Sequence, residues 1–157
     1  MQVGQVILIN NIDKIGGAPQ KSSIRPAIIR EIYAPNLIDV RLVSTIYVNG
    51  DVKAQSLEEA SEAIKNNLRG LFPHCEQYII ITPEEKGILN FSYVYGNMYT
   101  DIINTDKTEI TILKDRKTNV PFVISSDVKA KIEEKEIEAM IKDIIKQYDI
   151  EYKKINR

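Results

Sequence analysis

The connections between successive apolar segments of this chain are too short for a parallel sheet. The spacing of apolar residues and turn residues predicts strands over 77–82, 88–95, 98–104, 108–114 and 119–124. Gly96-Asn97 and the stretch from Asn104 to Lys107 are typical tight turns between neighbours in this series. Parallel neighbours need a crossover of about a dozen residues or more. The sheet is therefore expected to be antiparallel.

The first third of the chain follows the same pattern. Its apolar runs predict strands over 5–10, 26–33 and 38–48, and Asn49-Gly50 predicts a hairpin that returns as a short strand over 51–54. Isoleucine occurs 27 times in the chain, and β-branched residues favour strands. These features predict an α+β fold with a strongly bent antiparallel sheet.

Two helices are expected beside the sheet. Ser56-Leu57-Glu58-Glu59 is a capping box with Ser56 as the N-cap, and Gly70 is a suitable end for the helix that follows. A second helix is expected from Glu133 to Tyr148, with apolar residues at i, i+3 and i+4 positions; these are Ile137, Met140, Ile141, Ile144, Ile145 and Tyr148. This stripe predicts a helix packed on the sheet, with a second subunit as the alternative cover.

Length and charge limit the class of protein. A chain of 157 residues is expected to form a single domain, with a break into two lobes near residue 55 as the alternative. The net charge of −1 argues against a protein that holds nucleic acid by bulk electrostatics. Residues 1–48 nevertheless carry five basic against three acidic side chains, so a local basic site there remains open.

The composition also bears on location and on bound groups. No apolar run approaches the ~20 residues that span a bilayer, and the N-terminus lacks the pattern of a signal peptide. Cys75 is the single cysteine and His74 the single histidine, which excludes an internal disulfide and a zinc site built from these ligands. We expect a cytoplasmic protein with no membrane association, no metal and no cofactor.

The candidate site lies at the entrance to the second predicted strand. Arg25 precedes Pro26 there, and its planar guanidinium suits two-point contact with a phosphate. On the third predicted strand, alternation puts Leu42 and Ser44 on an apolar face and Arg41 and Thr45 on a more polar one. Leu42 is therefore expected to be buried, Arg41 accessible, and Thr45 the better hydroxyl partner for Arg25. An ordinary surface arginine and strand threonine are the alternative.

Residues 4–45 resemble the start of the PemK/MazF family of bacterial toxin endoribonucleases. The matching features are Gly4 before a strand, the polar loop from Gly17 to Ile24, Arg25-Pro26, and Ser44 or Thr45 on the next strand. The resemblance implies an SH3-like barrel, a homodimer, an antitoxin partner and cleavage of single-stranded RNA without a metal. It also implies that Arg25 is the catalytic arginine and that Thr45 is its hydroxyl partner.

The function expected from the sequence is thus that of a toxin-like endoribonuclease. Beside the catalytic pair, the residues expected to contact RNA are Gln20, Lys21, Ser44 and Arg41. The tyrosines Tyr93, Tyr95 and Tyr99 flank the Gly96-Asn97 turn and are suited to base stacking or to a partner pocket, with cross-strand packing as the alternative. The alternative function is a non-catalytic module of the same fold that binds a protein or a nucleic acid as inhibitor or adaptor.

Overall fold

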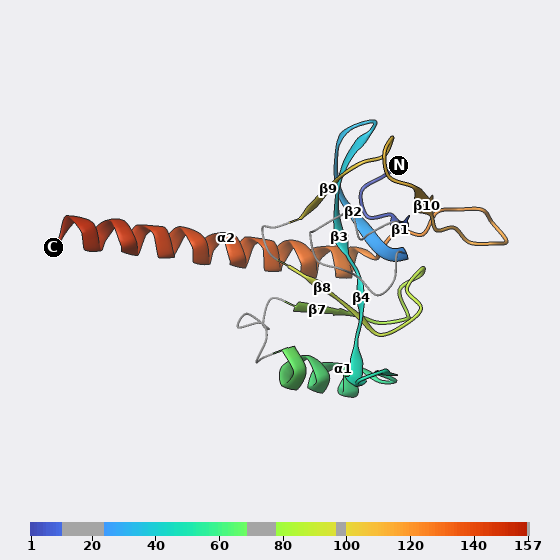
Figure 1. Cartoon of the computed structure of the whole chain (residues 1–157), viewed down its shortest axis with the longest axis horizontal. Helices are drawn as coiled ribbons and strands as arrows, with labels where there is room; N and C mark the ends of the chain where they lie inside the picture. The colour runs from blue at the N-terminus through green and yellow to red at the C-terminus, as the bar shows by residue number, and fades with distance from the viewer. Residues whose placement is uncertain (11–23, 69–77, 97–99, 157) are drawn as a thin grey trace.

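The computed structural model describes residues 1–10, 24–68, 78–96 and 100–156, and within these ranges the fold is α+β with antiparallel sheets (Figure 1). The largest sheet has five strands in the order β10 (Ile110–Ile112), β1 (Val6–Asn10), β2 (Ile24–Ala34), β3 (Leu37–Leu42) and β9 (Asp101–Asn104). Every pairing in it is antiparallel, as expected from the short connections.

The five-stranded sheet is curled because its two edge strands are consecutive in the chain. β9 and β10 lie at opposite edges, yet only residues 105–109 connect them. Five residues span at most about 18 Å, so the two edges must approach each other. No ladder joins β9 to β10 in the described part of the chain. The sheet is strongly bent, as expected, but it does not close into a barrel.

Two smaller sheets continue from the end of β3. The predicted strand over 38–48 breaks after Leu42, because the chain leaves the large sheet there and joins a second one in the order β4 (Ser44–Thr45), β8 (Ser92–Tyr95) and β7 (Tyr78–Ile81). The predicted hairpin at Asn49-Gly50 is confirmed as β5 (Tyr47–Asn49) and β6 (Val52–Lys53), with Gly50 at a φ of 59°.

Several pairings expected from adjacency are wrong. β8 pairs with β4 and β7, and β9 pairs with β3, so these two successive strands belong to different sheets. The segment expected as a strand over 119–124 makes only isolated bridges, from Pro121 to Lys114 and from Val123 to Gln5. Asn97 of the Gly96-Asn97 turn lies outside the described residues, and so does Gly70. Turn chemistry predicted where strands end but not which strands pair.

Both faces of the large sheet are buried. One face carries the cluster of Ile7, Ile9, Ala27, Ile29, Ile38, Val40 and Ile103, with Leu42 packed against it. The other face carries Val6 and Ile28, which pack with Val43 and with residues of β7, β8 and α2, including Ile132. Because both faces of the sheet are buried, side chains on both sides of β1 and β2 are apolar, and each strand contains a continuous apolar run in the sequence.

Two helices flank the sheets in the described part. The first, α1 (Leu57–Ala63), starts as predicted, with the Ser56 side chain accepting a hydrogen bond from the Glu59 amide, and continues as a π-helical turn over Ile64–Leu68. The second, α2 (Ser126–Ile155), is much longer than the predicted 133–148. Its N-cap is Ser125, whose hydroxyl accepts from the amide of Val128. No helix in the described part is long and apolar enough to cross a membrane.

The apolar stripe of α2 does not pack on the sheet. The C-terminal half of the helix projects beyond the strands (Figure 1), and the stripe residues remain at least half exposed: Ile137, Met140, Ile141, Ile144, Ile145 and Tyr148. The helix instead packs through Val128, Ile132 and Ala139, which share another side. The expectation that the stripe covers the sheet is therefore wrong.

Candidate active site

A half-open cavity of about 260 Å³ lies where the large sheet meets the β4–β8–β7 sheet. Its walls come from β2, β3, β4, β7, β8 and β9, and its polar lining residues are Arg25, Arg41, Ser44, Tyr78, Tyr93, Tyr95, Thr100 and Asp101. Val40 and Leu42 form the apolar part. Residues far apart in the sequence thus bring a guanidinium, a carboxyl, hydroxyls and aromatic rings to one place.

Arg25 contacts Ser44 and not Thr45, and the strand register explains why. Ala27 is opposite Leu42 in the β2–β3 ladder, and the Val43 amide still donates to the Pro26 carbonyl at 2.9 Å. Continuing this register sets Arg25 opposite Ser44, on the same face. The Arg25 Nη2 atom accordingly donates a hydrogen bond to the Ser44 hydroxyl.

Thr45 projects from the other side of the strand, where its partner across the ladder is Ser92, and it does not line the cavity. Alternation was predicted correctly, since Ser44 shares a face with Leu42. The error lay in choosing the hydroxyl partner of Arg25 from the opposite face, where Thr45 is.

Asp101 is the acidic group of the cavity, placed there by the β3–β9 pairing, which sets it opposite Val40. Desolvation by burial raises the pKa of Asp101, the negative charge of Asp39 raises it further, and the positive charge of Arg25 acts in the opposite direction. Burial also lowers the pKa of Arg25, with Tyr93 and Asp101 counteracting that effect. A guanidinium remains charged at neutral pH even so.

Three tyrosines form one wall of the cavity. The rings of Tyr78 and Tyr93 meet edge-on with centroids 5.2 Å apart, and those of Tyr78 and Tyr95 are 4.7 Å apart with a 35° tilt. Tyr78 lies opposite Tyr95 in the β7–β8 ladder, so this is cross-strand packing. All three rings are only half-buried and line the cavity. The same rings therefore pack against one another and present surface to a ligand in the cavity.

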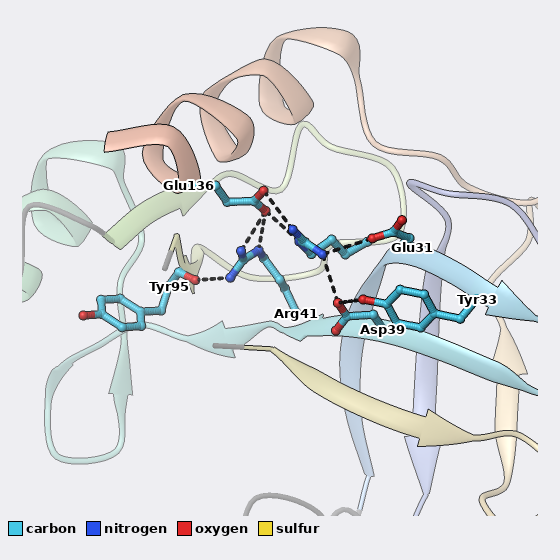
Figure 2. A network of polar contacts seen from close by, with 7 residues as sticks. Glu31, Tyr33, Asp39, Arg41, Tyr95 and Glu136 are labelled. Atoms are coloured by element: carbon cyan, nitrogen blue, oxygen red, sulfur yellow. Dashed lines mark hydrogen bonds and ion pairs between the residues drawn. The ribbon is translucent and has the colours of Figure 1, made fainter. Parts of the chain in front are cut away.

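Arg41 is buried in an ion network and is not the accessible residue predicted from alternation. Its relative exposure is 5%, because α2 covers this face of the sheet. Its Nε and Nη2 atoms donate to the Glu136 carboxylate on α2 at 3.0 and 2.7 Å, and Nη1 donates to the Tyr95 carbonyl at 2.7 Å (Figure 2). Arg41 therefore connects α2 to the strand that carries two cavity tyrosines.

The same network extends along β2 and β3. Arg30 donates from Nε to Glu136 at 3.1 Å and from Nη1 to the Oδ2 atom of Asp39 at 3.0 Å, and the Tyr33 hydroxyl reaches that oxygen at 3.1 Å (Figure 2). Asp39 is 1% exposed. Among the described residues its Oδ1 atom has no hydrogen-bond partner. This buried negative charge is one that raises the pKa of Asp101.

Several candidate site residues from the sequence lie outside the part of the chain that the structure describes. Gln20 and Lys21, expected to contact RNA, lie outside the described residues, as do His74, Cys75 and Tyr99. Within the described ranges no group of three or more His, Cys, Asp or Glu side chains is arranged to hold a metal ion. Searches against protein-family models, curated proteins and solved structures found no match to this chain.

Asp101, Tyr78 and Thr100 are the polar cavity residues that sequence reasoning missed. None stands in a recognisable motif. Asp101 reaches the cavity through the pairing of β9 with the distant strand β3, and Tyr78 through the pairing of β7 with β8. The alternating pair Tyr93 and Tyr95 was the one local signal on this wall.

Proposed function

We propose that the protein is an endoribonuclease that cleaves single-stranded RNA at the cavity around Arg25 and Asp101. The observation that carries the proposal is the convergence of a guanidinium and a carboxyl of raised pKa beside half-exposed aromatic rings. Kinship with the PemK/MazF toxins, whose start residues 4–45 resemble, would agree with this activity. It would bring with it a cytoplasmic location, a homodimer and an antitoxin partner.

The chemistry follows from the cavity groups. Asp101, when ionised, removes the proton from the ribose 2′-hydroxyl, and the 2′-oxygen forms a bond to the adjacent phosphorus. The bond from phosphorus to the 5′-oxygen breaks, that oxygen takes a proton from water, and a 2′,3′-cyclic phosphate remains. A raised pKa makes Asp101 a stronger base than an ordinary carboxylate.

The other cavity groups have distinct roles in this reaction. Arg25 stabilises the charge that develops on the phosphoryl oxygens, and Ser44 holds the guanidinium in place through its hydrogen bond. The faces of Tyr78, Tyr93 and Tyr95 provide stacking surface for unpaired bases. Single-stranded RNA fits best because its bases are free to stack.

The test is cleavage of an unstructured RNA oligonucleotide in the presence of a chelator. We expect cleavage products that end in a 2′,3′-cyclic phosphate. We expect no cleavage of a DNA oligonucleotide with the same sequence, because DNA lacks the 2′-hydroxyl. Arg25→Ala should lower the rate about 10²–10³-fold, and Asp101→Asn about 10²–10⁴-fold. Arg116→Ala, which removes an exposed arginine that does not line the cavity, should leave the rate unchanged.

Two results would overturn the assignment. Full activity of Arg25→Ala would place the catalytic site elsewhere. Tight RNA binding by the parent protein with no cleavage would instead support the alternative function, a non-catalytic binding module that uses the same cavity.

A further inference from the structure

The exposed stripe of α2 is an apolar surface on a helix that is already anchored through another side. Ile132 and Ala139 are its buried residues, and Ile132 packs with residues of β7 and β8. Each helical residue advances about 100°. Ile137 and Ile141 therefore lie on roughly the opposite side from Ala139. The relative exposures of Ile144 and Tyr148 are 64% and 75%, so the stripe faces away from the body of the protein.

The spacing of the stripe is that of a helix that packs on another helix. Ile137, Ile141, Ile144 and Tyr148 follow each other at intervals of four, three and four residues, and Ile155 continues the series one heptad after Tyr148. Met140, Ile145 and Tyr152 widen the surface on its flanks. The stripe is about 27 Å long at 1.5 Å per residue.

The charges along α2 are unevenly distributed. Between residues 133 and 138 the helix carries four glutamates and one lysine, whereas Lys153 and Lys154 stand near its C-terminal end. Among the described residues, Lys153 pairs with the exposed Asp149 and Lys154 with the exposed Glu151 of the same helix. Such exposed pairs are weak. A partner helix that runs in the opposite direction would bring complementary charge to both ends.

We propose that α2 pairs antiparallel with α2 of a second copy of this chain, about a two-fold axis near residue 146. That arrangement sets Ile137 opposite Ile155 and Ile144 opposite Tyr148, and it brings the glutamates of residues 133–138 to the end of the pair where Lys154 of the second copy lies. Gln147 lies beside its own copy at the axis. Glu151 is the one charged residue that falls on the stripe, opposite Ile141.

A parallel pair fits less well. It would place the glutamates of residues 133–138 beside their own copies and the lysines beside theirs, and like charges repel. It would also bring two folded bodies together at the same end of the pair, whereas the antiparallel pair separates them. The symmetric antiparallel contact is closed, with the same surface used on both subunits.

The first test is the oligomeric state of the full chain in analytical ultracentrifugation. We expect a dimer, and we expect Ile144→Glu to weaken it by about a hundredfold or more, because the change occurs twice in the symmetric contact. Leu89→Glu, at a position 88% exposed and outside the stripe, is the matched control and should remain dimeric. Unchanged helical circular dichroism will show that both variants fold.

The second test is cross-linking in a Cys75→Ser background, which sets the direction of the pair. Gln147→Cys should form an intermolecular disulfide on mild oxidation, because disulfides need Cα atoms within about 7 Å. Ile155→Cys, on the stripe itself, should not, since in the antiparallel pair its two copies are separated by roughly 27 Å along the axis. A parallel pair would bring the two copies of Ile155 together and reverse that result.

The proposal is overturned by a chain that stays monomeric up to about 100 μM, or by a dimer that Ile144→Glu leaves intact. A monomer that sediments with anionic phospholipid vesicles through the stripe would also overturn it, because lipid would then be the occupant. The dimer does not depend on RNA cleavage, so its failure leaves the proposed activity untouched.

Discussion

Replacing Glu136 should destabilise the protein more than any other single change on the surface of α2. Its Oε1 atom accepts from Arg30 and twice from Arg41. The Arg41 side chain is only 4% exposed, so water cannot readily replace the carboxylate there, whereas Arg30 is 33% exposed and can turn to solvent. The loss should therefore arise mainly at Arg41.

The magnitude follows from the two bonds that Arg41 would lose. Hydrogen bonds between charged groups contribute about 1.5–3 kcal/mol each, and breaking a buried ion pair by removing one partner costs about 3–5 kcal/mol. Glu136→Ala should lower the free energy of unfolding by that amount. For an m-value of about 2 kcal/mol/M, the urea midpoint should fall by about 1.5–2.5 M.

The assay is urea unfolding followed by circular dichroism, with Glu134→Ala as the matched control. Glu134 is exposed on the same helix, and its removal should change stability by less than about 0.5 kcal/mol. The double variant Arg41→Met/Glu136→Leu should recover most of the loss, because it leaves no unpaired buried charge. Equal midpoints for Glu136→Ala and Glu134→Ala would refute the reasoning.

Two further predictions concern Asp101 and the end of α2. Because burial raises the pKa of Asp101 in the folded state, the folded protein binds this proton more tightly than the unfolded chain, and stability falls as pH rises from the unfolded pKa through the folded one. Asp101→Asn should therefore match the stability of the parent at acid pH and exceed it above the raised pKa. Melting temperatures of both proteins measured across pH would show this. A constant difference in melting temperature at every pH would contradict it. Ending the chain after Asp143 removes most of the stripe but keeps the buried Ile132 and Ala139, so the product should melt cooperatively within a few degrees of the parent; a molten product would show that the stripe covers the core.

Local features of the fold were accessible from the sequence because they depend on neighbours in the chain. The Ser56 cap, the Asn49-Gly50 hairpin and the antiparallel sense of the sheets each follow from a few consecutive residues. Arg25 was also identified in this way, as an arginine fixed before Pro26 at the start of a strand.

The tertiary structure decided which side chains meet, because that depends on register and on which surfaces are covered. The β2–β3 register selected Ser44 over Thr45 as the contact of Arg25, and the pairing of β9 with β3 brought in Asp101. α2 buries Arg41 through Glu136 and turns its apolar stripe outward. An amphipathic pattern in the sequence indicates that a helix has an apolar side. What that side faces is determined only by the packing of the whole chain.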